Sequence, residues 1–389
     1  MSRSSSGQSP RNRPGDLVGA VYTSLSARLG KRLLDDVIAA RSLKPRLTLA
    51  KALAYVLATA VHALTLLTAA AGLFLLFTVG WNPIGIFPGI LLLVMAFELR
   101  PRVPQLSGTA AAHDAVAATL QLTGAIAREL NTANLDAIVI TPEYNAAFGR
   151  VGWRRRRVLL LGLPLFLSLD AQERVALLGH ELGHGVNGDS SRGLYIGTAL
   201  YSLRTWHGFL SPSPTVRRQN LAELLANAIM GLVAYIPGGA LRLLSHLNWR
   251  ESQRAEYLAD YLAAEVAGTD AVLAMLAKLH YRGRFANAVH QLALNDRMQD
   301  LMPELRRRLS QEDVAAALHD GAQTVEQYRL DATHPPTAYR MAFLKAHVVE
   351  RPQVTLSPLE VERLDRELSR FTPQVQKRLA DRYLRSLYR

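Results

Sequence analysis

Charged residues are absent from one long stretch of this chain, and that absence constrains the fold more than any other feature. From Ala52 to Phe97 the sequence contains 46 residues and no Asp, Glu, Lys or Arg. At about 1.5 Å per helical residue the stretch would extend over roughly 69 Å, about twice the hydrocarbon core of a bilayer. Gly80-Trp81-Asn82-Pro83 breaks it in two. The pattern predicts a helical hairpin that crosses a membrane twice, with a buried hairpin of a soluble protein as the alternative.

The distribution of basic residues indicates how this hairpin is oriented. Of the net charge of +13, residues 1–51 contribute +7, with ten Lys or Arg against three Asp or Glu. Arg100 and Arg102 follow the second apolar half, so the positive-inside rule places both ends of the hairpin in the cytoplasm. We therefore expect a multi-pass protein of the cell membrane, with a basic N-terminal segment over 1–46 and a transmembrane hairpin over 47–100. A nucleic-acid partner is not expected, because no reading motif or aromatic-interleaved basic patch is present.

Metal chemistry is the next signal. Cysteine is absent, so His, Asp or Glu must hold any metal. Asp170-Ala-Gln-Glu173 has the form of a capping box and opens a predicted helix that contains His180-Glu181-Leu182-Gly183-His184. Two histidines four positions apart share one helix face and can reach a single zinc ion at about 2.0–2.1 Å. Glu181 lies beside them, where its carboxylate can take a proton from a metal-bound water and pass it to a leaving amine.

A catalytic zinc site needs a third protein ligand, and here it has to be supplied from elsewhere in the chain. A helix predicted over Arg250–Ala267 presents Glu256 and Asp260 on one face. We expect Glu256 to be the third ligand of one zinc ion per chain. Asp260, one turn further on, is expected to accept the free ring N–H of a ligand histidine. The alternative is that both carboxylates are surface charges paired with Arg250 or Arg254.

Taken in order, these motifs resemble the membrane zinc metallopeptidase family typified by HtpX and the CAAX prenyl endopeptidases. Members pair HELGH with a downstream helix that Arg254-Ala-Glu256 and Ala259-Asp260 match here. The resemblance implies an edge strand at Asn145-Ala146 that binds the substrate backbone. It also implies that His334, in His334-Pro335-Pro336, and the following Arg340 stabilise the oxyanion of the tetrahedral intermediate.

The expected fold class is α+β and mostly helical, with a small edge-strand sheet in a zinc metallopeptidase domain over 109–348 and a helical extension over 349–389. Periodicity predicts strands at 136–141 and 157–161. Arg154–Arg157 lies between the edge strand and the next strand. We interpret this run as a solvated hairpin tip, with lipid headgroup contact as the alternative. Residues 17–46 are basic and amphipathic, typical of a solvated helix or of one resting on anionic headgroups.

One interval departs from the family pattern, which commonly has two further crossings before the glutamate ligand. Residues 224–241 are free of charge but interrupted by Pro237-Gly238-Gly239. Because Glu256 must meet His180 and His184 on one side of the bilayer, the interval makes zero crossings or two. We expect zero, with 224–241 lying against the membrane, dipping into it or covering the cleft.

These features together predict an integral membrane zinc metalloendopeptidase that hydrolyses peptide bonds with a zinc-activated water on the cytoplasmic side. The resemblance suggests membrane protein quality control, with membrane or misfolded polypeptides as substrates and the lipid bilayer as a partner. Two alternatives stay open. One is a membrane-tethered binding or scaffold protein with a structural zinc or a decayed protease site, and the other is a CAAX-type processing protease.

Overall fold

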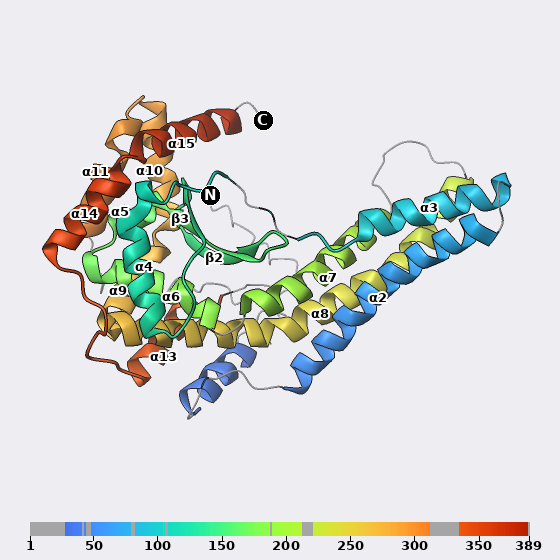
Figure 1. The fold of residues 1–389 in the computed structure, drawn as a ribbon, viewed down its shortest axis with the longest axis horizontal. Helices are drawn as coiled ribbons and strands as arrows, with labels where there is room; N and C mark the ends of the chain where they lie inside the picture. The colour runs from blue at the N-terminus through green and yellow to red at the C-terminus, as the bar shows by residue number, and fades with distance from the viewer. Residues whose placement is uncertain are drawn as a thin grey trace, which may run out of the picture.

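The chain divides into a globular part and a long arm of helices (Figure 1). The structure is a computed structural model, and it describes residues 28–40, 43, 48–78, 82–103, 105, 108–186, 189–211, 221–311 and 334–387. Most of the described residues are helical, and the globular part contains one three-stranded sheet. The predicted α+β, mostly helical class is confirmed.

The arm begins with two apolar helices that pack against each other, α2 (Leu49–Thr78) and α3 (Pro83–Leu99). The break predicted at Gly80–Pro83 coincides with the gap between them. The helices approach closely where each carries a glycine, since a Cβ on Gly72 would lie 2.9 Å from the carbonyl oxygen of Gly89. Many of their large apolar side chains are exposed, and α2 is long and apolar enough to cross a membrane.

Two more helices lie along α2 in the arm: α7 (Asp189–Leu210) and the N-terminal half of α8 (Leu221–Ala267) (Figure 1). Ala58, Ile196 and Leu244, one from each helix, are buried together where they meet. Residues 224–241 extend along the arm beside α2, so they do not cover the cleft. That they lie against the membrane or dip into it stays a prediction. By length and composition, α8 is a second helix able to cross a membrane.

The helix predicted to begin at Arg250 is the C-terminal part of this 47-residue helix. Pro237-Gly238-Gly239 does not interrupt it. The physical reason is tertiary packing. A Cβ on Gly238 would make an ordinary contact of 3.5 Å with the His207 ring of α7, so α8 packs directly against α7 where the sequence suggested a break.

The sheet is small and has one free edge beside the catalytic candidates. It consists of β1 (Ala137–Thr141), β2 (Ala146–Val151) and β3 (Arg156–Gly162), in the order β1-β3-β2. β1 runs parallel to β3, and β2 runs antiparallel to it with Val151 opposite Arg156. Both strands predicted from periodicity are present, and β2 is an edge strand, as the family resemblance implied.

Helices pack around the core of the globular part. The core is continuous across the globular part, and its largest fully buried side chains include Tyr257, Phe166 and Phe343. The helices not yet given, besides short 3-10 turns at Asp114–Val116 and Met298–Asp300, are α4 (Ala117–Glu129), α5 (Leu163–Ser168), α6 (Ala171–Val186), α9 (Thr269–His280), α10 (Arg282–Leu294), α11 (Leu301–Gln311), α13 (Thr337–Ala346), α14 (Pro358–Ser369) and α15 (Thr372–Leu387).

The C-terminal helices belong to the same core. The carboxylate of Glu367 in α14 accepts hydrogen bonds from the backbone N–H groups of Ala118 and Thr119 at 2.6 and 3.0 Å, and from the Thr119 hydroxyl at 2.7 Å. These are the unpaired donors at the start of α4, so a residue about 250 positions away caps that helix. Asp365 of α14 also pairs with buried Arg174 at 2.8 Å.

The N-terminal segment differs from both interpretations given for it. Residues 28–38 form a helix whose Leu33, Leu34 and Val37 are buried in the main core. The described part of 17–46 is therefore neither a solvated helix nor one resting on headgroups. Its amphipathic pattern reflects packing against the globular part, which charge and periodicity alone do not distinguish from surface binding.

Candidate metal centre and active site

The helix that carries the histidine pair is built as its local sequence predicts. α6 begins at Ala171, directly after Asp170 of the predicted capping box, and ends at Val186. The Glu173 carboxylate accepts the backbone N–H of Asp170 at 2.8 Å, which is one half of the predicted capping box. Burial raises the pKa of Glu173 above its ordinary value, against the opposing effect of Lys278, whose ammonium lies 2.7 Å away.

Helix α6 meets α8 through small residues on both sides. A Cβ on Gly179 would lie 3.2 Å from Cα of Ala263, and a Cβ on Gly183 would lie 3.2 Å from Cα of Ala259. Because neither glycine carries a side chain, the two backbones come into near contact. This close approach brings the histidines of α6 beside Glu256, which lies on α8 one turn before Ala259.

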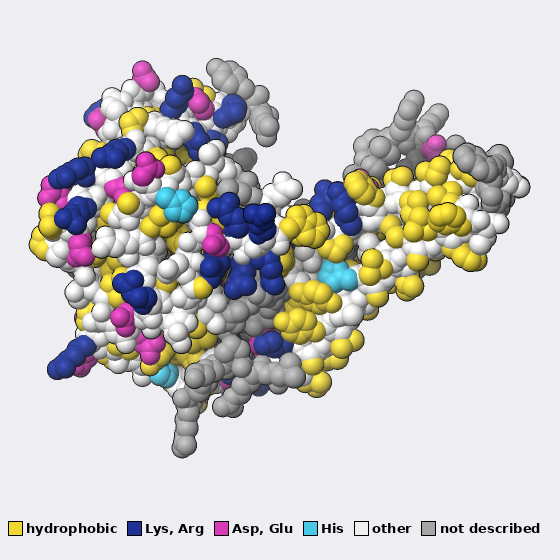
Figure 2. Space-filling model, in the orientation of Figure 1, with side chains coloured by type: hydrophobic (Ala, Val, Ile, Leu, Met, Phe, Trp, Pro, Cys, Tyr) yellow, Lys and Arg dark blue, Asp and Glu magenta, His cyan; other side chains and the backbone are white. Residues whose placement is uncertain are grey.

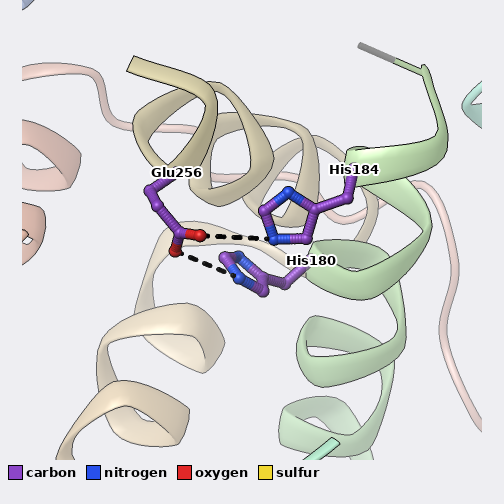
Figure 3. Close-up of side chains that lie close together, drawn as sticks. All are labelled: His180, His184 and Glu256. Atoms are coloured by element: carbon purple, nitrogen blue, oxygen red, sulfur yellow. Dashed lines mark ion pairs between the residues drawn. The ribbon is translucent and has the colours of Figure 1, made fainter. Parts of the chain in front are cut away.

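His180, His184 and Glu256 converge on one point (Figure 3). Nε2 of His180 lies 3.6 Å from Oε2 of Glu256, and Nε2 of His184 lies 3.5 Å from Oε1. Ligands at about 2.0–2.1 Å from a tetrahedral zinc ion are separated by about 3.3 Å. One potential ligand atom from each of the three residues lies within 4.8 Å of the others. The donor set and its spacing therefore fit zinc with three protein ligands.

A buried charge network supports the ligand histidine. Asp260 is fully buried, and its Oδ1 lies 3.0 Å from Nδ1 of His180. Arg340 donates two hydrogen bonds to the same carboxylate, at 2.7 and 2.5 Å. Burial alone would raise the pKa of Asp260, but the adjacent Arg340 guanidinium holds it below its ordinary value. The carboxylate is thus charged and can accept the ring N–H that directs the opposite nitrogen, Nε2, toward the metal position.

Glu256 is also held in its charged form. Burial opposes this, but the hydrogen bond from His334 and the neighbouring His184 and Arg340 lower its pKa below the ordinary value. Nδ1 of His334 lies 2.7 Å from Oε2 of Glu256, while the rest of the imidazole is largely open, with 60% of the side chain exposed. α13 begins at Thr337, three residues after His334, so His334 precedes the helix and Arg340 lies in its first turn.

The two residues assigned to the oxyanion both approach Oε2 of Glu256, but one is exposed and the other buried. His334 lies at the open side of the ligand cluster, and Arg340 lies on its buried side with its guanidinium 3.8 Å from Oε2 of Glu256. The Arg340–Asp260 pair was not predicted from the sequence, because no local spacing connects residues 80 positions apart. Only the structure, which places Arg340 and Asp260 beside the buried His180, reveals this pair.

Glu181 connects the cluster to the sheet. Its Oε2 accepts the backbone N–H of Phe148 in β2 at 2.8 Å, and its side chain is buried. This hydrogen bond comes from the outer edge of β2, so the free edge of the strand faces α6. Asn145 is exposed just before the strand, its carbonyl oxygen accepting from the Gly162 N–H at 3.0 Å, and Ala146 begins the strand.

A histidine pair and a glutamate on two helices, with a second glutamate next to the first histidine, define a metallopeptidase site of the His-Glu-x-x-His type. Comparison with known proteins gives the same class. Peptidase family M48 matches residues 115–348, well over half of the chain. The chain belongs to this family.

The curated relatives it matches are HtpX proteases. Protease HtpX of Acinetobacter baumannii (strain AYE) is 27% identical over 152 residues, which cover 38% of this chain and 50% of the relative. A Protease HtpX homolog of Pyrobaculum aerophilum is 26% identical over 221 residues, which cover 54% of this chain and 61% of the relative. Protease HtpX of Stutzerimonas stutzeri (strain A1501) is 26% identical over 172 residues, which cover 41% of this chain and 56% of the relative. The chain spans 50 to 61% of the length of these relatives. No solved structure matches it.

Proposed function

We propose that this protein is an integral membrane zinc endopeptidase that cleaves polypeptides at the cytoplasmic face of the cell membrane. The observation that carries the proposal is the His180, His184 and Glu256 cluster, with Glu181 next to it and bonded to the free edge of a strand. One zinc ion per chain would be held by these three ligands. When bound, zinc supplies a Lewis acid that activates water toward a peptide carbonyl.

The chain's own groups then divide the remaining work. Glu181 takes a proton from the attacking water and delivers it to the leaving amine. The outer edge of β2, with Asn145 and Ala146 at its start, aligns an extended substrate by strand addition. Glu181 accepts the Phe148 N–H in the structure, and an arriving substrate strand would compete for this donor and release the carboxylate for proton transfer.

Two further side chains bear on the developing oxyanion in this proposal. His334 serves as a direct donor, which its open position beside Glu256 supports. Arg340 contributes a fixed positive charge, since two hydrogen bonds to Asp260 hold the guanidinium in place. Asp260 in turn keeps the His180 ring oriented.

Membrane placement is supported by the arm. α2 and α8 are long and apolar enough to cross a bilayer, α3 is a shorter apolar helix beside them, and large apolar side chains are exposed along all three. Arg100 and Arg102 follow α3, and Lys51 lies in the first turn of α2, which by the positive-inside rule puts the globular part in the cytoplasm. A protease in this position suits membrane or misfolded protein substrates, and hence quality control.

The decisive comparison pairs two substitutions in the purified full-length protein, with bound zinc and cleavage of an unfolded polypeptide measured in each. Glu181→Gln should retain zinc and lose cleavage by about 10²–10⁴-fold. Glu256→Ala should lose both. If the zinc is only structural, Glu256→Ala should still lose zinc, but Glu181→Gln should not change whatever cleavage of the polypeptide is measured. Cleavage that survives Glu181→Gln with zinc bound would refute the mechanism.

The remaining alternatives have their own tests. A CAAX-type enzyme should cleave prenylated peptides in preference to unfolded chains. The absence of cysteine permits a direct test of orientation, because a single cysteine at Asn82, next to the α2–α3 turn, should label from outside intact cells. A cysteine at Asn295 in the globular part should label only after the cells are opened, and the reverse pattern would overturn the proposed topology.

A further inference from the structure

The tip of the β2–β3 hairpin exposes a large aromatic side chain. Residues 152–155 form a tight turn in which the Arg155 N–H donates to the Gly152 carbonyl at 3.0 Å. Gly152 and Arg155 both have positive φ, +68° and +51°, and for arginine this conformation costs about 1 kcal/mol. The turn leaves Trp153 at its outermost position with 91% of its surface exposed. A tryptophan so placed contributes nothing to the core.

The same tip concentrates positive charge. Arg154, Arg155 and Arg156 are exposed, and Arg157 is partly buried at the base of the hairpin. Among the residues that the structure describes, Asp136 is the one acidic side chain in reach of this run, 3.5 Å from Arg157 Nε. The Arg157 N–H donates to the same carboxylate and lowers the pKa of Asp136. The outer arginines are left as a cationic surface around an exposed indole.

The hairpin belongs to the side of the globular part that adjoins the arm. β2 packs against α7, and further along α7 the Ser202 hydroxyl donates to the carbonyl of Leu99, the last residue of α3, at 2.8 Å. The next basic residues, Arg100 and Arg102, are exposed. Figure 2 shows Lys and Arg side chains gathered where the globular part meets the apolar arm. Basic charge thus lies where the surface of a bilayer around the arm would be.

We propose that the β2–β3 hairpin tip binds anionic phospholipid headgroups, with Trp153 at the level of the interface and Arg154 and Arg155 on the phosphates. Indole rings favour the boundary between headgroups and acyl chains. Guanidinium groups match phosphate oxygens with paired hydrogen bonds. A single aromatic residue does not make a track for successive bases, so nucleic acid fits this tip less well. The inference rests on the membrane placement of the arm given above.

This contact would act on the active site through the strand itself. The tip joins directly to β2, whose outer edge donates the Phe148 N–H to Glu181. Headgroups that hold the tip would therefore fix the height and tilt of the proposed substrate edge relative to the bilayer. The hairpin would then be a positioning element, with no role in the chemistry.

The test uses the full chain with Trp153 as its single tryptophan, made by W81F, W206F and W249F and checked for one bound zinc per chain. The protein is reconstituted into vesicles of phosphatidylcholine with or without phosphatidylglycerol, whose brominated acyl chains quench a nearby indole. Trp153 emission should be quenched and blue-shifted in the anionic vesicles. In the same protein, Arg154→Gln with Arg155→Gln should reverse this. Each basic residue near an anionic surface strengthens binding by about 1 kcal/mol, or about fivefold in the binding constant. Loss of two arginines should therefore lower the ratio of membrane-bound to unbound hairpin tip about thirtyfold.

Lys377→Gln with Arg378→Gln is the matched control, because it removes the same charge from exposed positions on α15 and should leave quenching unchanged. Trp153 emission typical of water in both kinds of vesicle, or equal quenching with and without phosphatidylglycerol, would overturn the proposal while leaving the membrane placement intact. The proposal would also be overturned if the control pair lost as much quenching as the Arg154 and Arg155 variant. Quenching of Trp153 by a DNA oligonucleotide, without quenching by anionic vesicles, would overturn it as well. If the protein does not float with vesicles at all, both the inference and the placement fail.

Discussion

The contact between α6 and α8 makes a sharp prediction, because it is the contact that assembles the ligand cluster. In Gly179→Ala the added methyl carbon would lie 2.5 Å from Cγ2 of Val266 and 3.2 Å from Cα of Ala263. Carbon atoms pack best at about 3.5–4.0 Å. One of these neighbours is backbone and the other is a stiff β-branched side chain, so the helices have to separate by several tenths of an ångström.

The size of the effect follows from two opposing contributions. Overpacking a tight contact costs about 1–3 kcal/mol, whereas replacing glycine by alanine within a helix gains about 1 kcal/mol. The free energy of unfolding should therefore fall by up to about 2 kcal/mol. Separation of the helices would also stretch the 3.5 and 3.6 Å spacings between the histidines and Glu256. Ligand distances tolerate only about 0.2 Å, so zinc affinity should fall about tenfold or more.

Gly124→Ala is the matched control for this substitution. It also lies within a helix, α4, but its new methyl carbon would have no heavy atom nearer than 3.9 Å. It should raise the free energy of unfolding by about 0.5–1 kcal/mol and leave zinc affinity unchanged. Thermal unfolding and zinc titration with a competing chelator measure both quantities. If Gly179→Ala is as stable as Gly124→Ala and binds zinc as tightly as the parent chain, the close helix contact does not set the geometry of the site.

Three further predictions concern the C-terminal helices, pH and the metal. Glu367→Ala should lower the free energy of unfolding by about 1–3 kcal/mol in chemical denaturation, because three donors at the start of α4 lose their acceptor; a neutral result would refute the cap. Hydrogen bonds from Arg307 and Arg308 lower the pKa of Glu304 to about 2 from an ordinary 4.5. The folded state thus binds this proton more weakly than the unfolded chain. At pH 7 Glu304→Gln should therefore lower the free energy of unfolding by about 0.5–1 kcal/mol, and this loss should shrink as the pH falls from 4.5 to 2. A loss that does not change with pH would contradict the assignment. Removal of metal by a chelator should abolish cleavage and lower the melting temperature, since the ion would join α6 to α8, and added zinc should restore both; full activity without metal would exclude the proposed site.

Local sequence signals predicted much of this molecule. The charge-free stretch predicted α2 and α3 with their break, and alternation predicted β1 and β3. The capping residues Asp170 and Glu173 marked the start of α6, and the helix end predicted at Ala267 is the end of α8. Each of these signals acts within a few residues, where propensity, capping and burial agree. The histidine pair itself needs only the geometry of one helix.

The features that sequence analysis missed depend on distant packing. Pro237-Gly238-Gly239 suggested a break, but α7 and α2 hold α8 in one piece across it, so tertiary contacts override local propensity. Leu33 and Val37 are buried against the globular part, although their charged neighbours suggested a surface helix. The Arg340–Asp260 pair joins separate helices, and no period along the chain encodes it.

In the proposed membrane placement, the length of α8 would set the height of the cleavage site above the bilayer. The same unbroken helix contains the charge-free segment 224–241 and, further on, Glu256. From Arg242, the first charged residue after that segment, to Glu256 is 14 positions, or about 21 Å of helix. An extended chain covers about 3.3 Å per residue. A membrane-anchored substrate would therefore reach the site only with about six unstructured residues between its last buried residue and the bond to be cleaved, and tightly folded juxtamembrane regions would be spared.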